Sequence, residues 1–358
     1  MSYRLVRFAR VTAFLGLALA AACGDDEPPE SRPDFSACDA ATVVTLDSVP
    51  DRYLHPEFAV MTPKALGDSL QAMDHCIVVD AESRLHCFWT RGRGWENGLT
   101  FGHASSTDLV TWELHPSIEL ESDSHPIDRQ WAPQVFWSGE RWEMYFTGVD
   151  TIPDIRQNRQ RIFHATSDDL FRWSTATLAL EPRHPKTAWG RDIPFGSDGR
   201  DQIVFRMEGR TLMLLTVRMQ DGNQSLALAE QIDGTWSMVD VLESITGRAT
   251  ESPFIYAVDG RPRILLNNWK DGGQAVWNSN SLDGTWSRDP VELRGFAWEL
   301  MNLDGGYTMA SRVWGSSVML TNVDLEDLAA NNIVFPQCYT GDAPLLTPLT
   351  PIWEVELR

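Results

Sequence analysis

The chain reads His103-Ala-Ser-Ser-Thr-Asp-Leu-Val-Thr-Trp112 and, further on, His164-Ala-Thr-Ser-Asp-Asp-Leu-Phe-Arg-Trp173, which are two copies of one phrase. Each copy closes a unit of short apolar runs separated by turn signals, and such runs indicate antiparallel strands. The first unit spans residues 74–112 and contains four of these runs. The phrase therefore predicts a fold built from copies of one four-stranded unit.

Units of this kind begin near residues 74, 131, 201, 251 and 298, and the last one is degraded at its end. The spacing is typical of a β-propeller, in which each blade is a four-stranded sheet. Neighbouring blades cover each other's apolar faces, and closing the ring leaves only short strand edges exposed. We therefore predict an all-β protein, a five-bladed β-propeller of four-stranded antiparallel blades, as one domain over residues 46–358.

The charge of the chain limits its partners. Its formal net charge is −20, and a surface this acidic repels phosphate groups. Nucleic acid is thereby disfavoured, whereas a neutral oligosaccharide or polysaccharide is compatible. With 43% hydrophobic residues the chain can bury a large core, and we expect a monomer.

The N-terminal segment has the pattern of an export signal. Residues 1–23 contain three arginines, an apolar core over residues 11–19 and small residues before Cys23. The apolar core is too short for a comfortable membrane span. Leu19-Ala-Ala-Ala-Cys23 resembles a bacterial lipoprotein signal, which predicts cleavage before Cys23 and lipidation of its thiol. Cleavage by ordinary signal peptidase after Ala22 is the alternative.

Residues 24–45 form an acidic, proline-rich stretch with little to bury, which is typical of a flexible tether. We therefore expect the propeller in the bacterial cell envelope, either in the periplasm or at the cell surface. The lipid anchor would be its only attachment to the membrane. Secretion is the alternative for a chain that is not lipidated at Cys23.

Four cysteines follow the signal segment: Cys38, Cys76, Cys87 and Cys338. An even number in an oxidising compartment permits two disulfides, in three connectivities. If residues 80–83 form the turn of the first hairpin, Cys76 faces Cys87 across that hairpin, and Cys38 is left to pair with Cys338. The alternative is that the cysteines are buried free thiols. No Cys or His spacing indicates a zinc site, and we expect no metal and no cofactor.

The first strand of each blade lines the central channel of a propeller, so the starts of these strands meet at one mouth. Alignment of the strands by their turns puts these residues at comparable levels: Asp74, Trp131, Asp201, Glu251 and Trp298-Glu299. Three blades thus bring a carboxylate to one small space. Like charges are unfavourable there unless one carboxyl group is protonated, and this is how enzymes prepare a general acid at neutral pH.

Two motifs resemble those of known enzymes. Phe101-Gly-His-Ala-Ser-Ser-Thr-Asp-Leu-Val-Thr-Trp-Glu-Leu-His-Pro116 is similar to the phrase Trp-Gly-His-Ala-x-Ser-x-Asp-Leu-x-x-Trp-x-x-x-Pro of glycoside hydrolase family 32. Trp131-Ala-Pro-Gln-Val135 is similar to Trp-Ala-Pro-Asp/Glu-Val of family 43. From Asp74 onward the chain resembles the five-bladed propeller glycoside hydrolases, the superfamily of families 43 and 62 and of families 32 and 68. Its members include arabinosidases, xylosidases, arabinanases and fructan-acting enzymes.

This resemblance implies roles for three carboxylates. Asp74 falls at the family's first-blade aspartate, which is the nucleophile in family 32 and the general base in family 43. Arg200-Asp201 matches the start of Arg-Asp-Pro, whose aspartate positions the sugar or tunes the acid. Glu251, in Thr-Glu-Ser-Pro-Phe, matches the glutamate of Glu-Cys-Pro or Glu-Gly-Pro, which is the general acid.

Other residues are candidates for substrate binding. Trp131 and Trp298 lie at the level of the carboxylates, where they either stack on a sugar ring or serve as packing residues. Trp95, in an insertion of the first blade, either shapes the rim of the mouth or is an ordinary surface residue. Arg200 orients a carboxylate or a sugar hydroxyl, or it pairs with a structural acid.

We therefore expect an exported glycoside hydrolase that acts on a neutral glycan containing arabinose, xylose or fructose. Glu251 protonates the leaving oxygen, Asp74 attacks the anomeric carbon or activates a water, and Asp201 holds the ring hydroxyls. The alternative is a non-catalytic glycan-binding lipoprotein, which His75-Cys76 favours because the relatives have Pro-Asn or Pro after this aspartate. A structural or adhesion propeller is a third interpretation.

Overall fold

The structure is a computed structural model of the chain, and it describes residues 58–61, 70–82, 84–92, 99–107, 111–150, 158–190, 197–207, 209–247, 250–258, 261–268, 273–288, 296–303, 307–314 and 317–322. All of these belong to one of the chain's two units, Phe35–Arg358. The predicted signal segment and tether lie outside the described residues, as do Cys23, Cys38, Trp95 and Cys338. The expectations placed on them stay predictions.

Twenty strands in the described ranges form five antiparallel sheets of four strands each. Blade one comprises β2 (Gln71–Val79), β3 (Leu85–Gly92), β4 (Thr100–Ser106) and β5 (Glu113–Leu114). Blade two comprises β6 (Arg129–Trp137), β7 (Trp142–Asp150), β8 (Arg159–Ser167) and β9 (Thr177–Leu180). Blade three comprises β10 (Gly199–Met207), β11 (Arg210–Arg218), β12 (Gln224–Ile232) and β13 (Thr235–Gly247).

Blade four comprises β14 (Thr250–Val258), β15 (Arg261–Asn268), β16 (Gly273–Asn278) and β17 (Ser287–Arg288). Blade five comprises β18 (Phe296–Leu303), β19 (Tyr307–Trp314) and β20 (Ser317–Asn322), with β1 (Phe58–Met61) as its fourth strand. The predicted fold class, an all-β five-bladed propeller of four-stranded blades, is confirmed.

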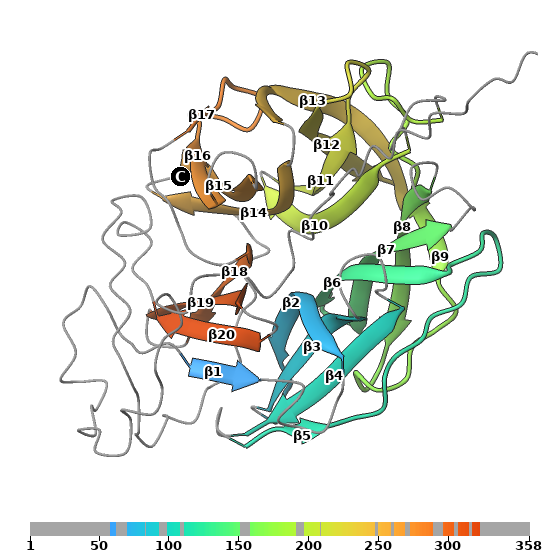
Figure 1. Cartoon of the computed structure of the whole chain (residues 1–358), viewed down its shortest axis with the longest axis vertical. Coiled ribbons are helices and arrows are strands. Elements are labelled where there is room, and N and C mark those ends of the chain that lie inside the picture. Colours follow the sequence, from blue (N-terminus) through green and yellow to red (C-terminus); the bar gives the residue numbers. More distant parts are fainter. Residues whose placement is uncertain are drawn as a thin grey trace, which may run out of the picture. The chain divides into compact units, whose positions relative to one another are not determined.

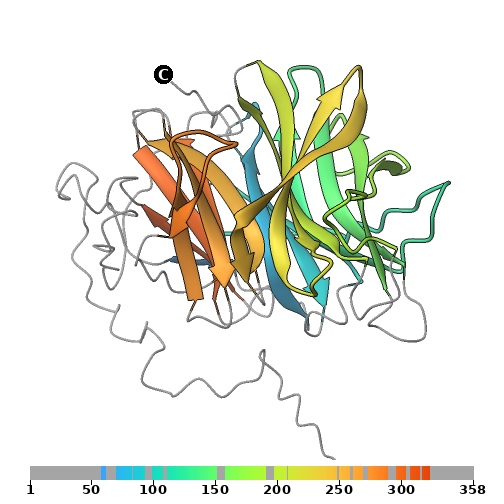
Figure 2. The same ribbon diagram turned by 90° about the horizontal axis from the view of Figure 1, so that it is seen from above.

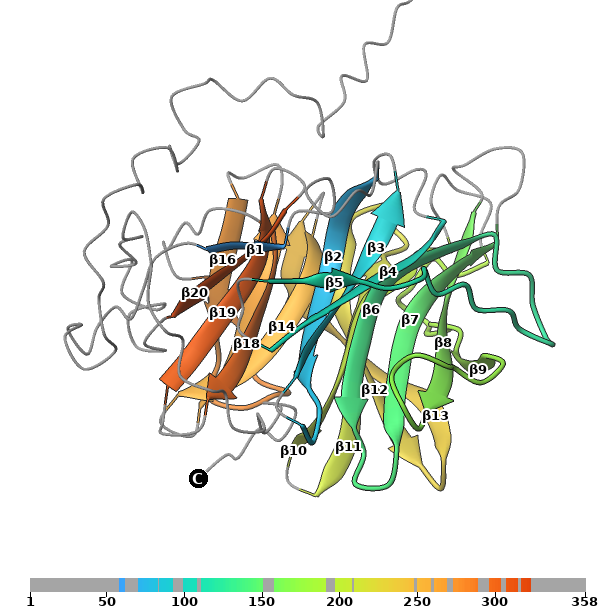
Figure 3. The same cartoon turned by 90° about the horizontal axis from the view of Figure 1, so that it is seen from below.

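The five sheets surround a common centre (Figure 1). Their innermost strands are β2, β6, β10, β14 and β18, and each contacts the innermost strand of the next blade, with β18 returning to β2. Turned by 90°, the sheets stand side by side in one layer, and their strands run between its two faces (Figures 2 and 3). No helix within the described ranges is long and apolar enough to cross a membrane.

Apolar side chains fill the spaces between the blades. One cluster joins blades one and two, where the rings of Phe101 and Phe146 meet edge to face with centroids 5.5 Å apart. A second cluster joins blades two and three. A third extends from Phe205 in blade three to Trp298 in blade five. Because each blade buries both of its faces against its neighbours, the ring holds the innermost strands in fixed relation to one another.

The N-terminal strand completes blade five. In this sheet β1 pairs antiparallel with β20, so that Phe58 lies opposite Leu320 and Ala59 opposite Met319. The fifth repeat lacks a recognisable end in the sequence because its outermost strand comes from the start of the domain. Sequence analysis did not find this strand, since four residues are too few for a periodic pattern.

Each innermost strand contains a β-bulge at the same place. The residue at the bulge has a positive φ in all five blades: Asp74 (20°), Ala132 (49°), Asp201 (54°), Ser252 (48°) and Ala297 (51°). None of these residues is a glycine, so each holds a backbone conformation that L-residues rarely adopt. Bulges re-aim side chains and are frequent beside active sites.

The first hairpin corrects the predicted disulfide. Its turn is one residue longer than expected, because the amide of Asp80 donates to the carbonyl of Arg84 and the Asp80 carboxylate accepts the amide of Arg84 in return. Cys87 is consequently opposite Ile77 and not opposite Cys76. Successive residues of a strand point to opposite faces, so the two thiols lie on different faces of the blade. Both are buried free cysteines, as the alternative interpretation had it.

Candidate active site

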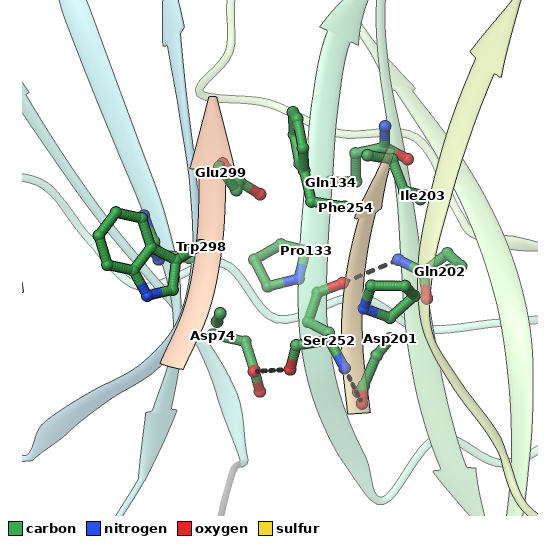
Figure 4. A pocket seen from close by; sticks show the side chains of 14 residues that line it. Asp74, Pro133, Gln134, Asp201, Gln202, Ile203, Ser252, Phe254, Trp298 and Glu299 are labelled. Carbon is green, nitrogen blue, oxygen red and sulfur yellow. Dashed lines mark hydrogen bonds between the residues drawn. The ribbon is translucent and has the colours of Figure 1, made fainter. Parts of the chain in front are cut away.

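The five bulges bring equivalent residues to one level of the central channel. Two of them carry carboxyl groups, Asp74 from blade one and Asp201 from blade three, and Ser252 from blade four carries a hydroxyl (Figure 4). Ala132 and Ala297 contribute only methyl groups from blades two and five. None of these five side chains is large, which leaves room at the centre of the ring.

The alignment predicted from the turns is shifted by one residue in three blades. Glu251 and Trp131 precede the bulge residue of their strand, and Trp298 follows it. A bulge adds a residue that counting between turns does not detect. Glu251 nevertheless lies close enough for its charge to act on both Asp74 and Asp201. The structure therefore brings the three predicted catalytic carboxylates together.

A pocket of about 40 Å³ follows the axis beside these carboxylates (Figure 4). Its walls are the bulge of each innermost strand and the residues after it: 74–75, 132–134, 201–203, 252–254 and 297–299. A space of this size accommodates a few water molecules. Glu251 does not line the pocket, and its side chain is 30% exposed, compared with 7% for Asp201. Glu251 is thus more accessible to solvent than Asp201.

Ser252 joins the two aspartates. Its hydroxyl donates a hydrogen bond to Oδ1 of Asp74 at 3.2 Å, and its backbone amide donates to Oδ2 of Asp201 at 3.1 Å (Figure 4). One residue of blade four therefore contacts carboxyl groups of blades one and three. Sequence reasoning did not select Ser252, because a serine after the expected general acid carries no chemical signal of its own.

Arg200 lies among carboxylates from two blades. Its guanidinium is 2.6 Å from Oε1 of Glu251, 3.1 Å from Oδ2 of Asp198 and 3.5 Å from Oδ2 of Asp201. Burial by itself would lower the pKa of Arg200, but the charges of these three acids raise it above its usual range. These contacts fit two of the roles predicted for Arg200, orientation of the Asp201 and Glu251 carboxylates and pairing with a structural acid, the buried Asp198.

A second arginine supports this arrangement from behind. Nε and Nη2 of Arg218 lie 3.2 and 2.9 Å from the same Oδ2 of Asp198 that Arg200 contacts. The Asp198 side chain is 1% exposed, so this carboxylate is fully enclosed by the two guanidinium groups and the blade. Asp198 lies just before β10, in a segment whose sequence carries no motif of its own.

The two aspartates titrate differently from free carboxylates. Burial raises the pKa of Asp74 to about 6, and the charge of Glu251 adds to the rise, while the Ser252 hydroxyl and Arg200 oppose it. Burial raises the pKa of Asp201 to about 8, where Arg200 opposes the rise and the charges of Asp74 and Glu251 add to it. At neutral pH one carboxyl group is thus mostly ionised and its neighbour mostly protonated, which is the state that acid–base catalysis requires.

A fourth carboxyl group lies further along the axis. Glu299 of blade five lines the pocket beyond the level of Asp74 (Figure 4). Burial raises its pKa well above the usual range, and the nearby charge of Asp74 adds to this, although the Ile77 amide and the Cys76 thiol donate to its oxygens. Sequence analysis placed Glu299 at the catalytic level but assigned it no role.

The predicted aromatic platforms are buried. Trp298 is 1% exposed and belongs to the apolar cluster of blades three to five, and Trp131 is 8% exposed. A ring enclosed on both faces has no surface for a sugar, so the structure favours the packing interpretation for both. Within the described ranges no group of three or more His, Cys, Asp or Glu side chains is arranged to hold a metal ion.

The ring of five blades with carboxylates at its axis defines the class of fold. The chain has the fold of the five-bladed β-propeller glycoside hydrolases, as structures from families 32 and 117 show. No protein-family profile matches the sequence, and no curated protein does.

Three solved structures illustrate the likeness. The endo-arabinase of Bacteroides thetaiotaomicron matches with a TM-score of 0.54 at 17% identity, over 72% of this chain and 96% of that one. The inulosucrase of Halalkalicoccus jeotgali, bound to kestose, matches with a TM-score of 0.55 at 15% identity, over 79% and 84%. A family 32 β-fructofuranosidase of Bombyx mori matches with a TM-score of 0.53 at 15% identity, over 74% and 63%. At these identities the likeness shows the fold.

Proposed function

We propose that this protein is a glycoside hydrolase that cleaves a neutral glycan containing arabinose, xylose or fructose. The observation that carries the proposal is the meeting of Asp74, Asp201 and Glu251 at the axial end of three different blades, within electrostatic reach of one another. A fold needs no such gathering of acids for stability, because burying like charges together is unfavourable. Glycoside hydrolysis uses a pair of carboxyl groups of this kind.

The geometry supports a distinct role for each acid. Asp74, with a pKa of about 6, is available at neutral pH as the nucleophile or as the base that activates a water. Asp201, with a pKa of about 8, keeps its proton and can donate a hydrogen bond to a ring hydroxyl. Glu251 protonates the leaving oxygen, because it is the most exposed of the three acids that contact Arg200. Because Arg200 lies 2.6 Å from Glu251, glycan binding must first loosen that ion pair.

The same contacts favour an uncharged substrate. The guanidinium of Arg200 is already shared among Glu251, Asp198 and Asp201 and is not available for an acidic sugar. The formal charge of −20 also disfavours anionic glycans. The similar proteins of known structure include an arabinase, an inulosucrase bound to kestose and a β-fructofuranosidase, which supports the choice of pentose and fructose polymers.

Hydrolysis assays test the proposal. The mature domain is incubated with aryl arabinofuranosides, aryl xylosides, arabinans and fructans, beside Asp74→Asn and Glu251→Gln. We expect kcat/KM on the cleaved substrate to fall by at least ~10³-fold in both variants. Glu230→Gln, which removes an acid paired with Arg210 on the outer part of blade three, serves as a matched control and should retain activity. Turnover that survives in both site variants would contradict the assigned roles.

A glycan-binding propeller without turnover is the second candidate. Two observations favour it: the short Arg200–Glu251 ion pair and the buried His75, whose pKa burial lowers to about 3, directly after Asp74. The same panel separates the candidates. If calorimetry detects binding of one glycan that the wild type does not cleave, the binding protein replaces the hydrolase. If the protein neither binds nor cleaves any of them, both proposals fail.

We further propose that the propeller is exported and lipid-anchored through Cys23. The proposal is supported by the signal-like pattern of residues 1–23 and by the tether-like composition of residues 24–45. In a bacterial host, a fatty-acid label should enter the wild type and not Cys23→Ala. Label in Cys23→Ala, or a wild type without label, would contradict the anchor.

A further inference from the structure

In blades two and three the backbone amide at the bulge finds its partner in the preceding blade. In blade two the amide of Ala132 donates to Oγ1 of Thr90 on β3 of blade one, at 2.8 Å. In blade three the amide of Asp201 donates to Oγ1 of Thr147 on β7 of blade two, at 3.2 Å. The bulge amide is thus held by a threonine of the preceding blade, and this bond is part of the repeat that joins blade to blade.

The same threonine exists for blade four but is not used. Thr90, Thr147 and Thr216 occupy equivalent positions, because each lies opposite the residue that precedes the bulge of its own blade. The repeat therefore predicts a bond from the Ser252 amide to Thr216. In the structure that amide donates to Asp201 instead, and Oγ1 of Thr216 makes no hydrogen bond with any described residue.

The Ser252 amide thus exchanges one acceptor, Thr216, for another, Asp201. This exchange has an energetic cost and a chemical result. Thr216 is fully buried, and a buried hydroxyl without a partner is unfavourable, so packing alone does not account for the exchange. What it achieves is a fixed donor for the Asp201 carboxyl group. The hydroxyl of the same residue reaches Asp74, across the channel from blade four to blade one.

We propose that Ser252 is a positioning residue, which holds the carboxyl groups of Asp74 and Asp201 in fixed relation through its hydroxyl and its amide. This proposal rests on the proposed function, since it assigns Ser252 to the same site. Besides each other, the two aspartates face Arg200 and Glu251, and Asp74 also faces Glu299. A donated hydrogen bond stabilises the ionised form of the carboxyl group that accepts it.

Two substitutions test the bond made by the hydroxyl. Ser252→Ala removes the hydroxyl and keeps the amide, so it acts on Asp74 alone. Ser252→Gly also removes the hydroxyl and in addition relieves the positive φ of 48°, so it controls for a variant that folds poorly. Any effect that both variants share is due to the hydroxyl.

The first measurement is a ¹³C NMR titration of the full mature protein labelled at its aspartate carboxyl carbons, assigned with Asp74→Asn and Asp201→Asn. In both Ser252 variants we expect the titration midpoint of Asp74 to rise by about 1 pH unit, because its carboxylate loses one hydrogen bond. The titration midpoint of Asp201 should not change. The acid limb of kcat/KM should move upward with Asp74. Unchanged midpoints would overturn the proposal. A shift without turnover in any variant would support the bridge and contradict the hydrolase.

The second measurement uses thermal unfolding to test whether the Ser252 amide donates to Asp201 and not to Thr216. Thr90→Val removes an acceptor that is in use, so its Tm should fall by a few degrees without moving either aspartate midpoint. Thr216→Val removes a hydroxyl that is not in use, so its Tm should be unchanged or higher. Equal losses in the two variants would show that Thr216 does hold the Ser252 amide and would overturn the exchange.

Discussion

Nη2 of Arg200 lies 2.6 Å from Oε1 of Glu251, and the two residues come from neighbouring blades. The side chain of Arg200 is 10% exposed, so the contact is shielded from solvent on the arginine side. It joins the innermost strands of blades three and four beside the pocket. The arginine charge also offsets the cost of burying carboxylates in this region. We therefore expect both the stability of the propeller and the proposed activity to depend on this guanidinium.

Replacement of Arg200 should destabilise the propeller. Arg200→Gln leaves Asp198, Asp201 and Glu251 without the shared cation, and the loss of one partner of a buried ion pair costs about 3 kcal/mol. Urea unfolding measures this cost. The control is Arg210→Gln, whose pair with Glu230 is more exposed and should contribute much less to the free energy of unfolding. Equal losses in the two variants would contradict the central place given to Arg200.

The raised pKa of Asp201 predicts how stability changes with pH. Its pKa is about 8 in the folded protein and lower in the unfolded chain, so the folded state binds more protons between these values. Stability from this group is present at acid pH and is lost as the pH rises toward 8. The Asp201→Asn variant cannot ionise at this position. The difference in free energy of unfolding between this variant and the wild type should therefore move in favour of the variant by about 1–3 kcal/mol from pH 5 to pH 8.5. Unfolding at the two pH values measures the difference, and a constant difference would contradict the raised pKa.

The two described cysteines should resist modification in the folded protein. Burial raises the pKa of both thiols well above the usual range, and Sγ of Cys76 lies 3.2 Å from the amide and 3.4 Å from the carbonyl oxygen of Val135. Only thiolates react readily with iodoacetamide. We expect Cys76 and Cys87 to stay unlabelled at pH 8 and to react fully in denaturant, as mass spectrometry of the peptides will show. A Cys76–Cys87 cross-linked peptide from unreduced protein would disprove this.

The glycine of the phrase Phe101-Gly-His-Ala should be intolerant of substitution. A Cβ on Gly102 would lie 2.0 Å from Cε2 of Trp89, whose indole is fully buried. Gly102→Ala should therefore cost about 2–3 kcal/mol of unfolding free energy through overpacking. A double-mutant cycle checks the cause, because in a Trp89→Phe background the smaller ring leaves space and the same change should cost less. An equal cost in both backgrounds would exclude the clash.

The repeat was visible in the sequence because its signals are local. Turn dipeptides, apolar runs and the phrase ending at Trp112 and Trp173 recur at spacings that follow from the size of a blade, and these predicted four strands per unit. The three catalytic candidates could be predicted from the sequence for the same reason, since each lies near the start of an innermost strand.

Other features depend on contacts that no local pattern encodes. Asp74 and Asp201 are bulge residues, whereas Glu251 precedes the bulge residue of its strand. The longer turn at Asp80 shifts the pairing of Cys87. The apolar pattern encodes neither of these positions. Ser252 gains its role only because strands distant in the sequence meet at the axis. A polar side chain that acts by bridging two others has no signature in its own segment.

The pairing of β1 with β20 makes closure of the ring a late step of folding. Phe58 and its partner Leu320 belong to the first and the last of the described strands. The first four blades can form from local hairpins, but β1 has no partner until β20 is in place, and closing so long a loop is slow. A partly folded chain thus exposes an unpaired strand edge until the five blades are assembled.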